Sequence, residues 1–210
     1  MQIEYNSSMK KIAVVGYKGK MGSPIFLALK ENFEVVGIGR NDDLVNIDNL
    51  DLVIDVASGT SSLCSAEYCL KKRIPLIIGA TGQTSEENRR IDEISKFIKI
   101  IKKSNFSVGF ELLKDFIDRV LIEMPENISI IEKHHIHKKD SPSGTALELK
   151  NYIEKKFLKN VHIYSIREGD IKGEHVIILK LKNEEIVIKH NVFSRDAFVD
   201  GIVKDVMNLI

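Results

Sequence analysis

The sequence lacks most of the features that mark special classes of protein. Its 210 residues include only two cysteines, Cys64 and Cys69, which have no second pair with which to form a zinc site or a disulfide framework. Lys and Arg number 31 against 30 Asp and Glu, so the formal net charge of +1 gives no reason to expect nucleic acid as a partner. No apolar run is long enough to span a membrane, and the first residues, MQIEYNSS, lack the order of a secretory signal. We expect a cytoplasmic protein that binds neither nucleic acid nor membranes.

Short β-branched runs alternate with polar, helix-like stretches through the first half of the sequence. Strands are expected at 11–15, 33–39, 51–57, 75–79 and 98–103, and helices at 21–32, 60–73 and 85–97. Apolar strands that alternate with helices are typical of a parallel sheet covered on both faces. The pattern predicts an α/β fold with a Rossmann-like, doubly wound parallel sheet.

The pattern changes after Ser107, where strands follow one another with few helices between them. We expect helices at 108–124, from Ser143 onward and at 196–210, and strands at 127–135, 161–166, 175–182 and 184–193. This order predicts a second, smaller α+β domain with a mixed or antiparallel sheet. The last helix has no sheet of its own and is expected to pack on the first domain. The predicted domains are residues 1–106 together with 196–210, and residues 107–195.

Three glycines, Gly16, Gly19 and Gly22, lie between the first strand and a helix that carries Pro24 in its first turn. Their spacing is G-x-x-G-x-x-G rather than the commoner G-x-G-x-x-G. Glycines at this turn let the backbone approach a pyrophosphate, whose charge is stabilised by the positive end of the helix dipole. The position of the glycines, more than their spacing, predicts nucleotide binding.

The end of the second strand bears on the choice of cofactor. An acidic residue there would select the free 2′-hydroxyl of NAD, but no acid occurs before Asp42. Arg40 can pair with a 2′-phosphate, which favours NADP, or it can be a solvated arginine in a loop. The sequence therefore predicts NADPH or NADH, with a preference for NADPH.

The segment EKHHIHKKDSPSGTA, residues 132–146, concentrates titratable side chains before a predicted helix. On a strand, His134 would share one face with Glu132, and His135 and His137 would share the other with Lys133. Adjacent histidines on opposite faces cannot bind one metal ion, so no metal is expected. Acid–base chemistry fits histidine and lysine, and Ser141 or Ser143 could cap a helix whose N-terminus binds an anion. The alternative is a charged, solvated corner.

At these residues the sequence resembles the dihydrodipicolinate reductase family. The resemblance covers nearly the whole chain from Lys10 onward and is carried by AVVGYKGKMG, GATG, NFSVG, EKHHIHKKDSPSGTA, REGDIKGEH and FSRDAFVDG. The family reduces a cyclic, unsaturated imine dicarboxylate with NAD(P)H, in the diaminopimelate route to lysine. The chain departs from the family in its small size, in a short stretch between Arg40 and Asp51, and in the missing acid.

The resemblance implies a role for each matching residue. It implies that His134 and Lys138 are the catalytic proton-transfer groups, and that His135, Gly144 and Thr145 bind a substrate carboxylate. The implied cofactor-binding residues are Gly16, Tyr17, Lys18, Gly19, Lys20, Met21, Gly79, Ala80, Thr81, Lys103, Ser104, Asn105 and Phe106, to which the strand-end argument adds Arg40. His137 is left with a structural role. The resemblance also implies a homotetramer assembled through the sheets of the second domain.

Three other interpretations remain open from the residues alone. Another reductase of the same layout would share the glycine loop but would not need HHIHKKDSPSGTA. A regulatory protein that senses NAD(P)H without catalysis would not need His134 and Lys138. A metal hydrolase is the third alternative and would contain metal when purified.

Overall fold

The computed structural model describes residues 9–120 and 125–210 and contains two compact units. The first unit is Met1–Lys103 with Gly201–Ile210, and the second is Ser104–Asp200. The domain boundaries expected from the sequence, after residue 106 and before residue 196, stay a prediction, because independent folding rather than contact density defines a domain.

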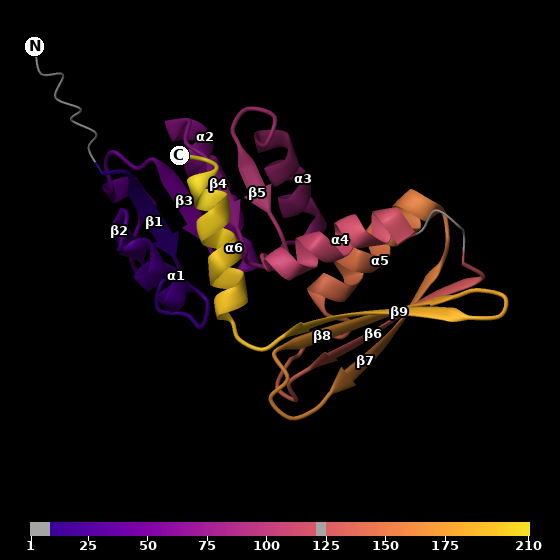
Figure 1. Ribbon diagram of the computed structural model, residues 1–210. Helices are drawn as coiled ribbons and strands as arrows, with labels where there is room; N and C mark the ends of the chain where they lie inside the picture. Colours follow the sequence, from indigo (N-terminus) through magenta and orange to yellow (C-terminus); the bar gives the residue numbers. More distant parts are fainter. Residues whose placement is uncertain (1–8, 121–124) are drawn as a thin grey trace, which may run out of the picture. The chain divides into compact units, whose positions relative to one another are not determined.

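A five-stranded parallel sheet forms the centre of the first unit (Figure 1). Its strands are β1 (Lys11–Val15), β2 (Glu34–Ile38), β3 (Leu52–Asp55), β4 (Leu76–Ile78) and β5 (Ile100–Lys102), in the order β2-β1-β3-β4-β5. The helices are α1 (Gly22–Leu29), a short 3-10 helix η1 (Leu44–Asn46), α2 (Gly59–Lys72) and α3 (Ser85–Ile94). The strand order reverses between β1 and β3, and ligands of doubly wound sheets bind at the carboxyl ends of such strands.

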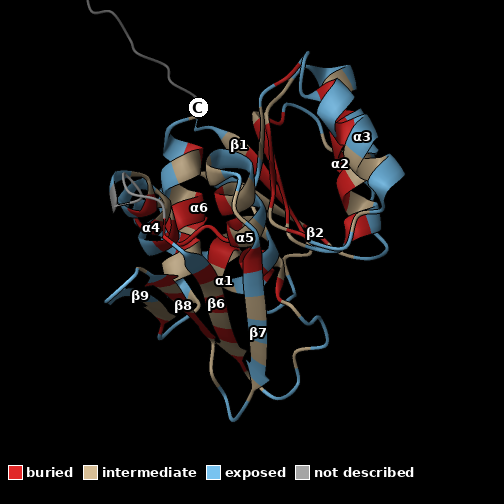
Figure 2. Cartoon of the chain, turned by 90° about the vertical axis from the view of Figure 1, so that its right-hand side faces the viewer, coloured by how far each residue is buried: buried red, intermediate tan, exposed pale blue. Residues whose placement is uncertain are grey.

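Helices cover both faces of this sheet. In Figures 1 and 2, α2 and α3 lie on one face, and α1 lies on the other with the last part of α6 (Asp196–Met207). Alternate residues of each strand face opposite sides, so Ala13 and Val15 pack with Cys69 of α2 and Ile94 of α3. Burial on both sides explains why these strands are continuous apolar runs, and the predicted doubly wound α/β fold is confirmed.

A mixed four-stranded sheet forms the second unit. Its strands are β6 (Asn127–His134), β7 (Val161–Arg167), β8 (Gly173–Lys180) and β9 (Glu185–Val192), in the order β7-β6-β8-β9. Strand β7 is parallel to β6, whereas β8 and β9 are antiparallel to their neighbours, so the predicted mixed sheet is confirmed. Helices α4 (Val108–Val120) and α5 (Gly144–Phe157) both lie on one face (Figures 1 and 2).

The covered face of this second sheet is apolar at one end and polar at the other. Ile128 and Ile130 of β6 face the helices and pack with Phe110 and Ile153. The next residues on the same face of β6 are Glu132 and His134. Strand register then aligns polar side chains with them: Glu132 is opposite Ser165 and His175, and His175 is opposite His190. The fold thus buries a polar cluster between the sheet and the first turns of α4 and α5.

The sequence predicted the type of each α-helix and strand discussed above, with differences at the ends, but it did not predict the 3-10 helix η1. The expected strand through His135 ends at His134, so the expectation that His135 and His137 share a strand face with Lys133 is wrong. The chain turns there because Lys138 donates its N–H to the carbonyl of His135. Residues 121–124 of the helix expected at 108–124 lie outside the described residues.

Candidate active site

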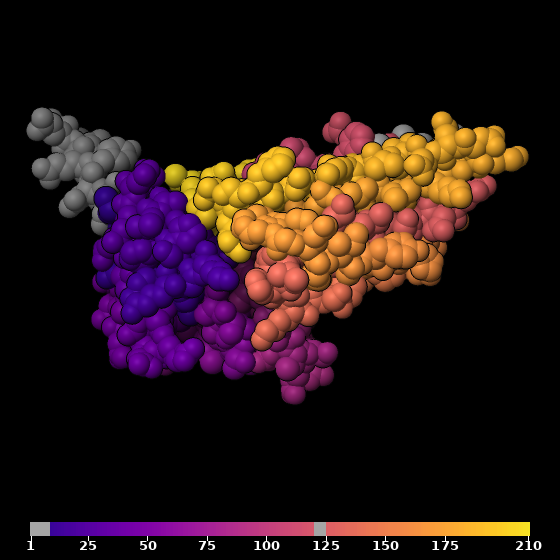
Figure 3. Space-filling view, turned by 90° about the horizontal axis from the view of Figure 1, so that it is seen from below, coloured from indigo at the N-terminus to yellow at the C-terminus, as the bar shows by residue number. Residues whose placement is uncertain are grey.

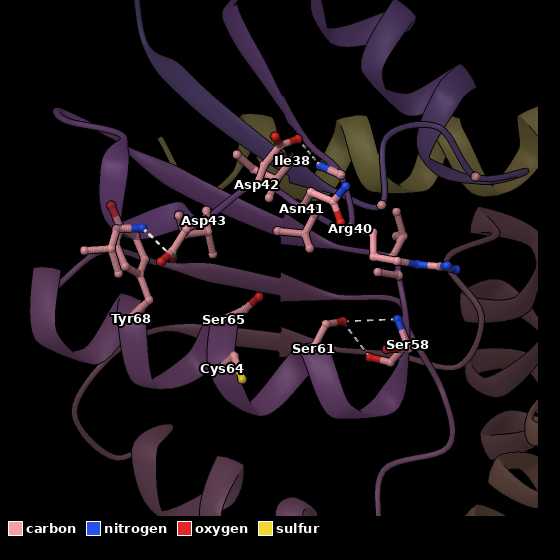
Figure 4. Close-up of a pocket in the computed structure, with 18 of the residues that line it drawn as sticks. Ile38, Arg40, Asn41, Asp42, Asp43, Ser58, Ser61, Cys64, Ser65 and Tyr68 are labelled. Carbon is pink, nitrogen blue, oxygen red and sulfur yellow. Dashed lines mark hydrogen bonds between the residues drawn. The ribbon is translucent and has the colours of Figure 1, made fainter.

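A cavity of about 1190 Å³ lies at the carboxyl ends of β1, β2 and β3 in the first unit (Figure 4). Four of the residues predicted to bind the cofactor line it: Gly16, Lys18, Gly19 and Arg40. Opposite them, the first turns of α2 contribute Ser58, Ser61, Cys64 and Ser65. This is the crevice in which doubly wound sheets bind nucleotides, and its volume accommodates the adenosine half of a dinucleotide.

The glycine loop is built so tightly that two of its glycines cannot be replaced. Gly16 has φ +83°, and a Cβ there would lie 2.8 Å from Cα of Ala57. A Cβ on Gly22 would lie 2.1 Å from the carbonyl oxygen of Gly16. The loop therefore brings the N-terminus of α1 close to the end of β1 and to Ala57, which follows β3.

Arg40 and Asp42 occupy the place where a ribose-selecting acid would be. Asp42 accepts a hydrogen bond of 2.7 Å from the N–H of Gly39, so its carboxylate is already engaged with the backbone. Arg40 is exposed at the rim of the cavity, and Figure 4 shows its side chain extended away from Asp42. A guanidinium that is free to move can meet an added phosphate, whereas the engaged carboxylate is less available to a ribose hydroxyl.

The predicted nicotinamide-side residues Gly79, Ala80 and Thr81 form a loop that leaves β4. The N–H groups of Gly79 and Ala80 donate to the carbonyl of Asp55, at 2.9 and 3.2 Å. From the other end of the loop, Gln83 Nε2 donates to the carbonyl of Ala80 at 2.9 Å and to Ser62 Oγ at 3.0 Å. The loop has no regular secondary structure, so these bonds determine its shape.

Other predicted cofactor residues lie outside the residues that line the cavity. The ring of Tyr17 packs against Gly37, where an added Cβ would lie 2.5 Å from the ring. The centroid of the Tyr17 ring lies 5.3 Å from that of Phe26. Lys20 and Met21 continue the glycine loop into α1, and Lys103 forms an ion pair of 2.8 Å with Asp205. In the second unit, Ser104 donates to Glu148, and Phe106 is buried.

In the second unit, the predicted catalytic His134 is held by a buried carboxylate. Its Nδ1 lies 2.5 Å from Oε2 of Glu132, while Oε1 of the same carboxylate accepts from Arg167 at 2.8 Å and from the N–H of Ser143 at 3.2 Å. Glu132 is completely buried and His134 is 7% exposed. The network sets the ring orientation and places the proton of a neutral imidazole on Nδ1, which leaves Nε2 free for proton exchange.

Burial and the charges of this cluster shift the pKa values of Glu132 and His134. Burial raises the pKa of Glu132, but hydrogen bonds from Arg167, Ser165 and His134 outweigh it and bring the pKa to about 2. Burial lowers the pKa of His134, the carboxylate of Glu132 opposes that shift, and the positive charges of Lys138 and Arg167 add to it. His134 is therefore a neutral imidazole near pH 7, a state in which it can accept a proton.

The N-terminus of α5 faces the same cluster. Ser143 caps the helix by accepting from the N–H of Ala146 at 3.2 Å, as the sequence allowed. Thr145 is buried, and its Oγ1 lies 3.5 Å from Nδ2 of Asn105. Asn105, predicted to bind the cofactor, thus lies next to Thr145, predicted to bind the substrate. Lys138, 23% exposed, pairs with Asp140 at 2.9 Å.

The sequence interpretation gave no role to several residues that hold this site together. Arg167, whose Nη2 also donates to the carbonyl of Asp140 at 2.6 Å, was noticed only within the motif REGDIKGEH. Gln83 carried no signal, and Asp140 was noticed only as one of the titratable residues of the segment 132–146, because the partners of both residues are set by folding. The sequence did predict that Glu132 and His134 lie on the same face of a strand, since residues two apart on a strand share a face.

No metal or membrane site emerges from the described part of the chain. Among its residues, no group of three or more His, Cys, Asp or Glu side chains is placed to hold a metal ion. Over the same residues, no helix is both long and apolar enough to cross a membrane.

Comparison with known proteins shows the family of this chain. Family models described as dihydrodipicolinate reductase, N-terminus and C-terminus, match residues 35–106 and 109–210. The 4-hydroxy-tetrahydrodipicolinate reductase of Thermosipho africanus is 31% identical over 196 residues, 92% of this chain and 88% of the relative. That of Wigglesworthia glossinidia brevipalpis is 39% identical over 180 residues, 82% of this chain and 68% of the relative. The chain belongs to the dihydrodipicolinate reductase family.

Solved structures show the same fold. A dipicolinate-bound dihydrodipicolinate reductase from Paenisporosarcina sp. TG-14 superposes with a TM-score of 0.74 at 19% identity, covering 96% of this chain and 95% of that one. An aspartate dehydrogenase from Thermotoga maritima gives a TM-score of 0.63 at 15% identity, covering 96% and 97%.

Membership of the dihydrodipicolinate reductase family confirms the recognition made from sequence motifs, and with it the predicted NAD(P)H-dependent oxidoreductase. Family membership favours a dihydrodipicolinate reductase over the three alternatives, which were another reductase, a regulatory sensor and a metal hydrolase. The match of the N-terminal family model starts at residue 35, after the glycine loop, whereas the alignments to whole relatives cover up to 96% of this chain.

Proposed function

We propose that this chain reduces 4-hydroxy-tetrahydrodipicolinate, or the dihydrodipicolinate formed from it by loss of water, to tetrahydrodipicolinate with NADPH or NADH, in the diaminopimelate route to lysine. His134 and Lys138 are its proton-transfer groups, and His135, Gly144 and Thr145 bind a substrate carboxylate. The observation that carries the proposal is the buried Glu132–His134 pair, 2.5 Å apart, beside Lys138 and the N-terminus of α5.

Each side chain has a chemical task in this reaction. Hydride transfer to a conjugated imine builds negative charge on the substrate ring, which the ammonium of Lys138 stabilises and to which it can donate a proton. His134 exchanges a proton through Nε2, since Glu132, which accepts from Arg167, holds Nδ1 in place. The helix N-terminus at Gly144 and Thr145, together with His135, suits a carboxylate.

The cofactor residues of the proposal belong to two groups. Gly16 to Met21 would hold the pyrophosphate, and Gly79, Ala80 and Thr81, with Lys103 to Phe106, would face the nicotinamide. NAD(P)H, when bound, supplies the hydride, and the chain contributes orientation and charge. We propose NADPH as the preferred form, because Arg40 is exposed at the rim of the cavity while the carboxylate of Asp42 is bonded to the backbone.

The proposal includes a cytoplasmic homotetramer. Helices cover only one face of the second sheet, and Figure 3 views the other face, where strands β7, β8 and β9 run from orange to yellow. Exposed apolar side chains lie on that face, among them Tyr164, 59% exposed, and Val187, 53% exposed. An uncovered apolar sheet face supports assembly between copies of the chain. Both cysteines are free thiols, which is in keeping with a reducing compartment.

The decisive experiment measures loss of NADPH absorbance when the purified protein meets freshly generated 4-hydroxy-tetrahydrodipicolinate. We expect turnover by the wild-type chain, faster with NADPH than with NADH at low cofactor concentration. Lys138→Ala should lower kcat by about 10²- to 10⁴-fold, the usual contribution of a general acid, while NADPH binding stays nearly unchanged.

Lys139→Ala is the matched control, because Lys139 is the exposed neighbour in the same turn. Its kcat should stay within about twofold of the wild type. Unchanged turnover in Lys138→Ala, or no turnover by the wild-type chain, would refute the assignment.

A further inference from the structure

Asp140 lies in the turn between β6 and α5, in the middle of the residues assigned to the substrate. Its Oδ1 is 2.9 Å from Nζ of Lys138, and the backbone N–H of Gly144 faces the same carboxylate. Burial raises the pKa of Asp140, but the hydrogen bond and charge of Lys138 and the N–H of Gly144 outweigh it, so the pKa is lowered. Asp140 is thus an ionised group that accepts from both partners.

In the proposed function, the N–H of Gly144 binds the substrate carboxylate, and the ammonium of Lys138 is the cation beside it. A lysine ammonium beside a helix N-terminal N–H suits one carboxylate, since the positive charge and the helix dipole act on the same anion. In this structure an internal carboxylate takes that place. Its position is set from behind, because Arg167 donates to the backbone carbonyl of Asp140 at 2.6 Å.

The exposed fractions of the Asp140 and Lys138 side chains indicate which of the two can move out of the ion pair. The Asp140 side chain is 54% exposed and that of Lys138 only 23%. Rotation of the Asp140 side chain into water leaves the hydrogen bond from Arg167 intact, since Arg167 holds the carbonyl of Asp140 and not its carboxylate. The carboxylate can therefore give up Lys138 and Gly144 while the loop keeps its shape.

We propose that Asp140 is an internal competitor that determines the affinity of this subsite for the substrate carboxylate. The inference rests on the proposed function of Lys138 and Gly144. A substrate carboxylate takes these donors only by displacing Asp140, so binding exchanges one ion pair for another. The apparent affinity is the intrinsic affinity multiplied by the fraction of molecules in which Asp140 has left the subsite.

The test is the binding of pyridine-2,6-dicarboxylate to the full-length protein saturated with NADP⁺, measured by calorimetry for wild type and Asp140→Asn. Asparagine keeps the shape of aspartate and removes its charge. We expect the Kd of Asp140→Asn to fall about two- to fivefold, the strength of a partly exposed ion pair. In the Lys138→Ala background the same substitution should leave the Kd unchanged, because the contested cation is gone.

Asp118→Asn is the matched control, since Asp118 forms an ion pair with Lys156 on the helices of the same unit. Its Kd should equal that of the wild type. Asp140→Ser and the thermal midpoint of each variant check that a change in Kd does not reflect misfolding. A Kd that rises or stays constant in Asp140→Asn and Asp140→Ser overturns the inference. Absence of binding by the wild-type chain would instead overturn the proposed function.

Discussion

At the scale of single residues, His175 is the most unusual group in the second unit. It is 1% exposed, and neither ring nitrogen has a hydrogen-bond partner among the described residues. Its ring meets that of His134 edge-on at 5.5 Å and stacks on that of His190 at 6.1 Å. Burial lowers its pKa to about 3, and the neighbouring histidines add to the shift.

This shift makes the stability of the protein depend on pH. Below pH 6.5 an unfolded histidine binds a proton, whereas folded His175 does not until about pH 3, so the free energy of unfolding falls as the pH drops through this range. At pH 5 the term is about 2 kcal/mol. His175→Phe, which keeps a ring in place, should therefore lose less stability between pH 8 and pH 5 than the wild type.

The measurement is denaturant unfolding at both pH values. His162→Phe removes an exposed histidine from strand β7 and serves as the control. Equal pH dependence in His175→Phe and wild type would show that the buried imidazole is protonated in the folded state.

At the scale of elements, the loop between β4 and α3 depends on one side chain. Gln83 donates both to the carbonyl of Ala80 and to Ser62 of α2, and Gly59 leaves room for the loop, because a Cβ there would lie 2.5 Å from Gly82. Thr84 is the N-cap residue of the next helix, α3. The loop is thus fastened at its end to α2 and α3, which fixes the place of Gly79 to Thr81.

Gln83→Met tests this arrangement, because methionine has nearly the same length and no donor. We expect kcat with NADPH to fall about tenfold, since small misplacement of the nicotinamide costs alignment. Binding of adenosine 2′,5′-bisphosphate, a probe of the adenosine half alone, should not change. Equal losses for the probe and for NADPH would point to general damage of the first unit, and unchanged kcat would show that the loop does not depend on Gln83.

At the scale of the whole molecule, the proposed assembly rests on the uncovered face of the second sheet. Ile166 and Tyr164 of β7 and Val187 of β9 are exposed there, while Lys133 of β6 and Lys189 of β9 pair with Glu174 on β8 between them. A tetramer of chains of 23.8 kDa would have a mass of about 95 kDa. Light scattering after gel filtration should give that mass for the wild type.

Tyr164→Lys should shift the mass toward smaller species, because a charge replaces apolar contact area. Phe97→Lys alters an exposed aromatic of the first unit, 76% exposed, and should leave the mass unchanged. A monomeric wild type, or the same shift in both variants, would contradict assembly through this face.

Local pattern was enough to determine much of this protein. Apolar runs that alternate with helical stretches predicted the doubly wound sheet, because strands buried on both faces must be apolar along their length. Glycines at the first strand-to-helix turn predicted the nucleotide loop, since only glycine tolerates φ +83° and the close approach of Ala57. The segment of residues 132–146 contained the catalytic candidates because they are consecutive in sequence.

Only the tertiary structure decided which distant groups complete the site. Arg167 reaches Glu132 because β7 pairs with β6 in a register that puts residue 167 opposite 134. Gln83 reaches Ser62, and Asn105 reaches Thr145, by packing that no sequence spacing encodes. Even Asp140, two residues from Lys138, faces it only because the chain turns after His134. Short-range periodicity determines the elements, whereas strand register and packing determine which charges meet.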